Sequence, residues 1–182
     1  MRAIYITGFM AVGKTSIGNE LGKVLDLPVI DTDQYIEEKL AWDIPSIFER
    51  KGEMYFRDEE QTALRELPRE NVIITTGGGM VLRKENRCFM KENGYVITLE
   101  SSVNTIFNRL HDDLSRPLAA GKTRRELQKL FKQRQPYYHD ADLIVETEGK
   151  SIPRIAPEIV GWIKTQMLSK RSTDRGCSNS PK

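Results

Sequence analysis

The stretch GFMAVGKT, residues 8–15, constrains the fold of this chain more than any other feature. It follows the apolar run IYIT and matches G-x-x-x-x-G-K-[ST], the pattern of a loop that wraps phosphate groups between a strand and a helix. Downstream, Ile17, Leu21, Val24 and Leu25 recur at the spacing of one helical stripe. The alternative, a glycine-containing turn with an exposed lysine, leaves this strand–helix context unexplained. The stretch therefore predicts an ATP-binding P-loop.

The residues of this loop suit different parts of a nucleotide. Gly8 and Gly13 allow backbone angles that turn successive N–H groups inward onto phosphates, and the following helix adds the positive end of its dipole. Lys14 would bring a compact cation to the β- and γ-phosphate oxygens, and the Thr15 hydroxyl would ligate Mg²⁺. The loop residues expected to contact ATP are Ala11, Val12, Gly13, Lys14, Thr15 and Ser16.

Five short runs of apolar or β-branched residues punctuate the chain. Most are continuously apolar rather than alternating, as expected of strands that are covered on both faces of a parallel sheet. Helical patterns lie between them, which indicates βαβ units. The sequence therefore predicts an α/β chain with the three-layer P-loop NTPase fold, a five-stranded parallel sheet with helices on both faces. The expected strands are residues 3–7, 27–31, 71–76, 94–100 and 141–147.

Two insertions interrupt this alternation within a single predicted domain, residues 1–168. Residues 33–67 hold two or three helical patterns where one would suffice, and residues 111–124 are polar with a proline and a glycine. Both are expected above the sheet, where ligands bind in this class. We interpret them as a helical substrate-binding insertion and a lid. Residues 169–182 are polar without an apolar period and are predicted to be a disordered tail.

The charge balance disfavours some classes of partner. The net charge is +2, from 28 basic and 26 acidic residues without a block of one sign, so a nucleic-acid groove is not expected. No apolar stretch approaches the roughly 20 residues that span a bilayer, and the N-terminus lacks a signal peptide's apolar run. Cys88 and Cys177 lack CxxC spacing, so no structural zinc site is expected, and Cys88 is expected to be buried. We therefore expect a cytosolic protein, and the lack of a conspicuous apolar interface stripe makes a monomer the expected state.

The second predicted strand ends in Asp31, Thr32 and Asp33. Taken alone, Asp33 is as well explained as the N-cap of the next helix, a role that aspartate favours. However, the carboxyl end of this strand is expected beside the phosphate loop, where phosphoryl transfer uses carboxylates. Asp31 could order the water molecules of the metal, and Asp33 could accept a hydrogen bond from the hydroxyl of a phosphoryl acceptor.

Arginine and consecutive glycines downstream suit an anionic acceptor. Arg57 and Glu60 are three residues apart, which also fits an ordinary ion pair on a helix surface. Gly77, Gly78 and Gly79 are more glycines than a turn needs, and they suit a backbone that approaches a ligand closely. A flexible loop is the alternative interpretation of this triplet.

Three further arginines, Arg109, Arg116 and Arg134, follow along the chain. Each of them, taken alone, is more often a solvated side chain. Arg116 is the exception, because it lies in the insertion that has the length and composition of a lid. An arginine in such a lid can close over the γ-phosphate.

Taken together, these motifs resemble the shikimate kinase family, which belongs to the nucleoside-monophosphate-kinase-like branch of P-loop proteins. The resemblance covers about residues 1–165. Beyond the P-loop each motif is weak alone, whereas the ordered series is specific. The segments that carry it are GFMAVGKT, DTD, GE-x-x-FR (Gly52 to Arg57), TTGGG, RPL (Arg116 to Leu118) and R-x-P-Y (Arg134 to Tyr137).

The resemblance implies ATP-dependent phosphorylation of the 3-hydroxyl of shikimate. It implies that Asp33 hydrogen-bonds the shikimate hydroxyls and is a candidate base. Arg57 and Arg134 are expected to hold the shikimate carboxylate, with the backbone of Gly78 and Gly79 beside it. These roles are physically sensible, because a carboxylate ligand suits bidentate arginine and a vicinal diol suits a carboxylate acceptor.

For the nucleotide, the resemblance implies catalytic roles for Lys14 and Arg116 on the transferred phosphoryl group. Thr15 is expected to ligate Mg²⁺, and Asp31 to reach the ion through water. Arg109 is expected to stack against adenine. ATP and shikimate are thus the expected small-molecule substrates, with Mg²⁺ as the metal ion.

The chain departs from the family pattern at two positions and leaves three rivals to exclude. Ala11 and Ala119 stand where many members have glycine and leucine, and only local effects are expected. A kinase of another hydroxy acid such as gluconate is disfavoured by the joint presence of DTD, GE-x-x-FR and TTGGG. A GTP-dependent switch would need a guanine-specifying Asn-Lys-x-Asp segment, which the sequence lacks. A non-catalytic homologue is disfavoured by the complete set of polar site residues.

Overall fold

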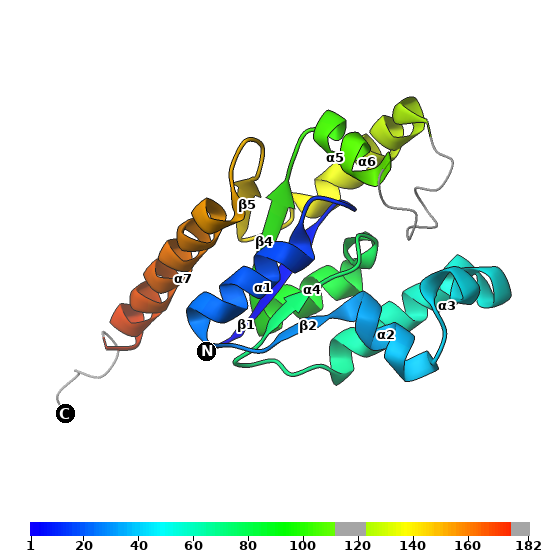
Figure 1. The fold of residues 1–182 in the computed structure, drawn as a ribbon. Helices are drawn as coiled ribbons and strands as arrows, with labels where there is room; N and C mark the ends of the chain where they lie inside the picture. Colours follow the sequence, from blue (N-terminus) through cyan, green and yellow to red (C-terminus); the bar gives the residue numbers. More distant parts are fainter. Residues whose placement is uncertain (112–122, 176–182) are drawn as a thin grey trace.

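The sheet is parallel throughout and has the strand order β2–β3–β1–β4–β5 (Figure 1). It is seen in a computed structural model that describes residues 1–111 and 123–175. The five-stranded parallel sheet predicted from the sequence is confirmed, with each strand inside or within one residue of its expected range. The strands are β1 (Ala3–Gly8), β2 (Val29–Asp31), β3 (Ile73–Thr75), β4 (Gly94–Glu100) and β5 (Leu143–Glu146).

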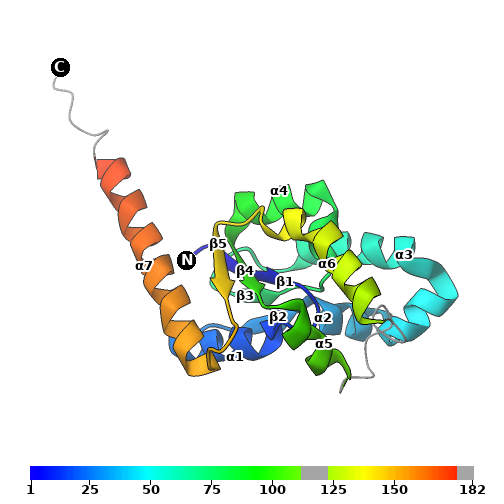
Figure 2. The ribbon, with the colours of Figure 1, turned by 90° about the horizontal axis from the view of Figure 1, so that it is seen from above.

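Helices cover both faces of the sheet. They are α1 (Lys14–Leu25), α2 (Thr32–Leu40), α3 (Ile44–Glu66), α4 (Lys84–Asn93), α5 (Val103–His111), α6 (Arg124–Tyr138) and α7 (Ile152–Arg175), with a 3-10 turn over Met80–Leu82. Figure 2 shows α1 and α7 on one face and α4 and α6 on the other. Ile4 and Ile6 of β1 pack on the side of α1 and α7, and Ala3 and Tyr5 pack on the side of α4 and α6. Alternate residues of one buried strand thus serve both layers.

Strand β1 lies in the middle of the sheet, between β3 and β4. The chain leaves β1 toward β2 on one side and later crosses to β4 on the other side. In open parallel sheets, ligands bind in the crevice beyond the carboxyl ends of the strands, where the winding reverses in this way. A ligand-binding site is therefore expected among the residues that follow β1 and β2.

Helices α2 and α3 form the predicted insertion, and they stand out from the sheet in Figure 1. They share a small apolar core of their own, which includes Ile36, Ile47 and Phe56. Gly52 breaks α3 with φ 82° and ψ 171°. Only glycine adopts this backbone region readily. The break separates a first segment, which begins at Ile44, from a second segment that carries Arg57, and both segments reach the same cavity.

The expected lid lies mostly outside the described residues, and α7 extends into the expected tail. The structure begins α6 after Thr123, so most of the predicted lid, with Arg116 and Ala119, lies outside the described residues. The tail was expected to begin at residue 169, but α7 continues to Arg175. The sequence contains no glycine or proline between Gly161 and Gly176 to end that helix earlier. Residues 176–182 lie outside the described part of the chain.

The expectation that Cys88 is buried is wrong, because its side chain is exposed on α4. The buried residues of α4 are Asn86 and Met90, one turn apart. Cys88 lies midway between them and so points to the opposite side of the helix. Among the described helices, none combines the length and the apolar character needed to cross a bilayer.

Candidate active site

The predicted phosphate loop leaves β1 at Gly8 and enters α1 at Lys14. Gly8 has a φ of 142°, and a Cβ atom there would lie 2.6 Å from the Leu99 carbonyl oxygen. Gly13 has φ 104° and ψ 23° directly before the helix. Residues with a side chain rarely adopt such positive φ angles. The shape of the loop therefore requires both glycines of the motif.

Lys14 is the cation of the loop. Its side chain is buried, and Nζ donates hydrogen bonds to the carbonyl oxygens of Gly8 and Phe9, both at 3.0 Å. The loop carbonyls thus hold the ammonium group close to the backbone that the motif predicts to contact phosphates. A buried ammonium beside an N-terminal helix end makes this loop a strong site for an anion.

Asp31 connects three elements at the carboxyl edge of the sheet. Its Oδ2 accepts hydrogen bonds from Thr15 Oγ1 at 3.0 Å and from Thr75 Oγ1 at 2.8 Å. Its Oδ1 accepts from the backbone N of Asp33 at 3.0 Å and of Gln34 at 3.4 Å, so Asp31 is the N-cap of α2. The N-cap role considered for Asp33 therefore belongs to Asp31, and Asp33 lies in the first turn of the helix.

Thr15 and Asp31 present a hydroxyl and a carboxylate oxygen 3.0 Å apart beside Lys14. In the described residues there is no group of three or more His, Cys, Asp and Glu side chains placed to hold a metal ion. This donor set fits Mg²⁺, which usually takes one or two protein oxygens and fills its other positions with water and substrate phosphates. It does not fit an ion held by protein ligands alone.

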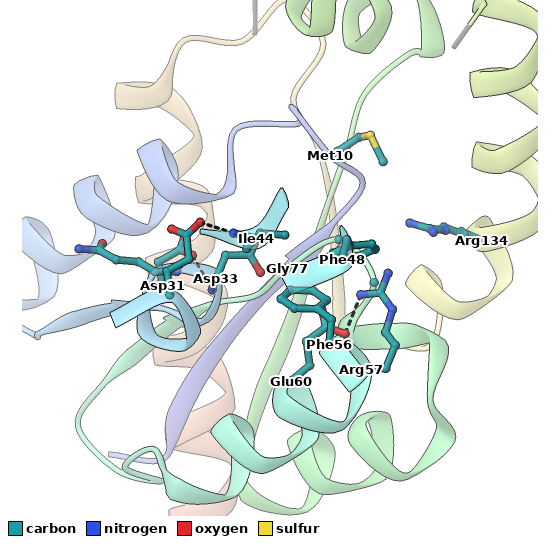
Figure 3. Close-up of a pocket in the computed structure, with 14 residues that line it drawn as sticks. Met10, Asp31, Asp33, Ile44, Phe48, Phe56, Arg57, Glu60, Gly77 and Arg134 are labelled. Atoms are coloured by element: carbon teal, nitrogen blue, oxygen red, sulfur yellow. Dashed lines mark hydrogen bonds and ion pairs between the residues drawn. The ribbon is translucent and has the colours of Figure 1, made fainter. Parts of the chain in front are cut away.

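Two cavities meet at the carboxyl edge of the sheet. One, of about 350 Å³, contains the P-loop residues and Arg109, and we call it the donor cavity. The other, of about 320 Å³, lies under α2 and α3, and we call it the acceptor cavity (Figure 3). Asp31 and Asp33 line both.

The predicted site residues divide between these cavities along the expected lines. All five residues expected to bind the acceptor line the acceptor cavity, and every residue expected to bind ATP lines the donor cavity except Arg116, which lies outside the described residues. The acceptor set is Asp33, Arg57, Gly78, Gly79 and Arg134. The donor set is Ala11, Val12, Gly13, Lys14, Thr15, Ser16 and Arg109.

Ala11 and Arg109 form one wall of the donor cavity. Arg109 Nη1 donates hydrogen bonds to the carbonyl oxygens of Ala11 and Val12, both at 3.2 Å. Ala11 has a φ of 58°, a left-handed conformation that costs a non-glycine residue about 1–2 kcal/mol. This strain explains why glycine suits the position, and the loop nevertheless keeps its shape with alanine.

Close approach accounts for the first and third glycines of the triplet. A Cβ atom on Gly79 would lie 2.0 Å from Arg57 Nη1, and one on Gly77 would lie 2.3 Å from Asp33 Oδ1 and 2.9 Å from Glu60 Oε1. Either side chain would displace charged groups of the acceptor cavity. The interpretation of the triplet as a merely flexible loop is therefore not supported.

Arg57 is held from two sides. Its Nη1 donates to Glu60 Oε2 at 2.6 Å, and its Nη2 and Nε donate to Glu53 Oε1 at 2.8 and 3.3 Å. The surface ion pair considered from the sequence is in fact buried, because Arg57 is 7% exposed and Glu60 is fully buried. Arg134 of α6 is equally buried, and both guanidinium groups extend into the acceptor cavity (Figure 3). Two buried cations in one small cavity suit a ligand with a carboxylate or similar anion.

Glu60 is a site residue that the sequence analysis missed. Burial raises the pKa of its carboxyl group to about 7, the charge of Asp33 contributes in the same direction, and Arg57 acts against both. Glu60 Oε1 has no hydrogen-bond partner among the described residues. The sequence signal was weak, because a glutamate three residues after an arginine is common on exposed helices.

We expect Glu60 to make the stability of the fold depend on pH. Its pKa is higher in the folded than in the unfolded chain, so its contribution is fully present below pH 4.5 and is lost as the pH rises through about 7. The loss amounts to about 3 kcal/mol in the free energy of unfolding. Urea unfolding at pH 5 and pH 8 should show a smaller decrease for Glu60→Gln than for the parent chain.

The exposed Glu49→Gln on the same helix is the control for this experiment and should unfold like the parent at both pH values. A parent-like decrease in Glu60→Gln would show that the carboxyl group does not titrate in this range.

Apolar residues complete the acceptor cavity, and the sequence did not single them out for this role. They come from the P-loop and from both segments of α3, and Figure 3 shows them together with the two aspartates and the two arginines. A cavity with apolar walls and a few converging charged groups is typical of a small-molecule site. The residues are Met10, Ile44, Phe48 and Phe56.

A P-loop at the carboxyl edge of a parallel sheet, with an acceptor cavity joined to it through two aspartates, defines a kinase of small molecules. Comparison with protein families narrows this class. A family model described as shikimate kinase matches residues 10–164. This chain belongs to the shikimate kinase family.

Individual relatives agree with this assignment. A shikimate kinase of Bacillus cereus is 48% identical over 159 residues, 87% of this chain and 96% of that protein. One from Persephonella marina is 43% identical over 165 residues, 90% of this chain and all of that protein. The solved structure of Acinetobacter baumannii shikimate kinase in complex with shikimate superposes with a TM-score of 0.88 at 34% identity, covering 92% of this chain and 96% of that one.

A gluconokinase from Sinorhizobium meliloti also has a similar structure, with a TM-score of 0.59 and 11% sequence identity over 94% of this chain and 97% of that one. At that identity the similarity concerns the fold alone. The distinction between the two kinds of kinase therefore depends on the acceptor cavity.

Proposed function

We propose that the chain transfers the γ-phosphate of ATP to the 3-hydroxyl of shikimate, giving 3-phosphoshikimate and ADP, with the site residues in the roles given below. The observation that carries these roles is that Asp31 and Asp33 line both cavities. A phosphoryl donor in one cavity and a hydroxyl acceptor in the other would meet at these carboxylates. Phosphoryl transfer is catalysed mainly by such positioning and by neutralisation of charge.

In the acceptor cavity, Arg57 and Arg134 bind the carboxylate of shikimate, beside the backbone of Gly78 and Gly79. Asp33 accepts the hydrogen bond of the reacting hydroxyl and orients its oxygen toward the donor cavity. Support comes from the burial of both guanidinium groups and from the position of Asp33 between the cavities. A charge-assisted bidentate contact fixes the ring of the acceptor more firmly than a neutral contact would.

In the donor cavity, the backbone of the P-loop and Lys14 bind the β- and γ-phosphates, and Arg109 lies beside the adenine. Thr15 would ligate Mg²⁺, and Asp31 would hold the ion's water. When bound, Mg²⁺ offsets the negative charge of the phosphates. Arg116 of the predicted lid is proposed to approach the γ-phosphate, and its position lies outside the described residues. The lid would also exclude water, which could otherwise receive the phosphoryl group.

The described residues of one chain build both cavities, so we propose that the enzyme acts as a monomer. No partner subunit is needed to complete the acceptor or donor contacts described above. The near balance of basic and acidic residues also argues against nucleic acid as a partner.

The proposal is tested by the release of ADP in a coupled assay with and without shikimate. We expect release that requires shikimate and that gluconate and nucleoside monophosphates do not support, because the two buried arginines together with the apolar walls of the small cavity suit a compact cyclic acid. ADP release that ignores shikimate but responds to gluconate or a nucleoside monophosphate would overturn the acceptor assignment. The product should be 3-phosphoshikimate by phosphorus NMR.

A further inference from the structure

Tyr138 is a buried residue at the end of α6 to which the proposed reaction assigns no task. It lies one helical turn after Arg134, and its side chain is 4% exposed. Its hydroxyl donates a hydrogen bond of 2.6 Å to the carbonyl oxygen of Gly78, one of the glycines that line the acceptor cavity. Its ring lies against Phe9 of the P-loop in an edge-to-face arrangement, with ring centroids 6.3 Å apart.

The bond from Tyr138 completes the hydrogen bonding of the carbonyl groups in the glycine triplet. The Gly77 carbonyl oxygen accepts from the backbone N of Met80 at 3.1 Å, and that of Gly79 accepts from Leu82 at 3.0 Å. The Gly78 carbonyl oxygen accepts from Tyr138. The N–H groups of Gly78 and Gly79, by contrast, have no hydrogen-bond partner among the described residues. The triplet thus keeps two donors available at the wall of the acceptor cavity.

The sheet fixes Tyr138 itself. Its carbonyl oxygen accepts a hydrogen bond of 2.8 Å from Thr98 Oγ1 in β4, and Thr98 Oγ1 lies 2.6 Å from Thr7 Oγ1 in β1. Thr7 directly precedes the first glycine of the P-loop. Burial raises the pKa of Tyr138 to about 12, against the lowering effect of Arg134. The phenol therefore stays protonated and remains a donor at any pH at which the enzyme would be assayed.

We propose that Tyr138 is a positioning residue for the phosphoryl acceptor. Its hydroxyl holds the Gly78 carbonyl group, and this contact keeps the N–H groups of Gly78 and Gly79 at the cavity wall. Because Tyr138 and Arg134 lie one turn apart on α6, one helix sets both the guanidinium group and the backbone donors that meet the acceptor. The inference rests on the proposed function, since it concerns the same cavity.

The test is Tyr138→Phe, which keeps the ring against Phe9 and removes only the hydroxyl. The Gly78 carbonyl oxygen then loses its partner inside the protein. We expect the KM for shikimate to rise by about tenfold, the size expected when one buried hydrogen bond is lost, and the KM for ATP to change less than about twofold. The adjacent Tyr137→Phe is the matched control, because Tyr137 is 39% exposed and packs its ring under Arg87. It should leave both KM values unchanged.

A second measurement needs no substrate. Backbone hydrogen exchange of a peptide that spans residues 77–82, in which the N–H groups of Gly77, Met80 and Leu82 are hydrogen-bonded, should be faster in Tyr138→Phe than in the parent chain, and unchanged in Tyr137→Phe. Parent-like exchange, or equal rises in both KM values, would overturn the positioning role. If the parent chain shows no activity with shikimate, the proposed function fails, whereas faster exchange would still support the contact between Tyr138 and the glycine loop.

If Tyr138→Phe does not fold, Thr98→Val replaces it in both measurements. This change removes the hydroxyl that holds the Tyr138 carbonyl oxygen and keeps the shape of the side chain. We expect the same selective rise in the KM for shikimate, smaller than about tenfold because the contact is one step further away. An unchanged KM for shikimate together with parent-like exchange would contradict the proposal.

Discussion

Lys14→Met is expected to lower kcat by about a hundred- to a thousandfold, the effect of removing one preorganised charge from a phosphoryl-transfer site. Methionine has nearly the length of the lysine stem, so the change removes the ammonium group and keeps most of the packing. Lys14 is buried, and its Nζ is held by the carbonyl oxygens of Gly8 and Phe9. The positive charge therefore has a fixed position in the loop. The ammonium group does not have to move during the reaction, so little reorganisation energy is needed.

The measurement is steady-state kinetics with saturating shikimate and ATP, alongside the thermal unfolding midpoint. Lys23→Met is the matched control on the same helix, because the Lys23 side chain is 76% exposed and makes a surface pair with Glu20. Such pairs contribute little to stability. The control should keep parent kcat. A Lys14→Met enzyme that is folded and retains more than a tenth of parent kcat would contradict the assigned role.

The parts of the molecule that local patterns encode could be predicted from the sequence. The continuous apolar runs predicted five parallel strands because a strand buried on both faces has no polar side to show. The P-loop was predictable because its glycines are needed for local backbone conformations with positive φ. Gly8 and Gly13 have φ angles of 142° and 104°. Ordered motifs also placed Arg57 and Arg134 in the same site, although they are distant along the chain.

The features that depend on tertiary contact could not be predicted. Glu60 looks like a surface residue in the sequence, and it is buried because the second segment of α3, after the break at Gly52, lines the acceptor cavity. Tyr138 lies just beyond the recognised R-x-P-Y segment, and its partner Gly78 is 60 residues away. Cys88 was misplaced because an apolar side chain in a helical pattern does not reveal which neighbouring element will cover it. In each case the environment comes from a different part of the chain.

Asp33→Asn is expected to lower kcat by about a hundred- to ten-thousandfold, the range for loss of a general base or of an equivalent orienting carboxylate. Asparagine keeps the shape of the side chain but can no longer accept a proton at neutral pH. The affinity for ATP should stay within about threefold, because the phosphate contacts proposed here come from the P-loop and Lys14. The exposed Asp26→Asn is the control, since asparagine tolerates the left-handed backbone at that position.

The same substitution should leave the fold as stable as before or more stable, although it removes activity. Asp33 Oδ1 and Glu60 Oε1 both lie close to Gly77. They are 2.3 and 2.9 Å from the position that a Cβ atom on Gly77 would occupy. Burial, and then the charge of Asp33, raise the pKa of Glu60, so the two carboxylates repel each other. Active sites commonly keep such unfavourable pairs at the expense of stability. A thermal midpoint at or above that of the parent, together with the loss of kcat, is the expected result. A large fall in the midpoint would assign Asp33 to structure instead.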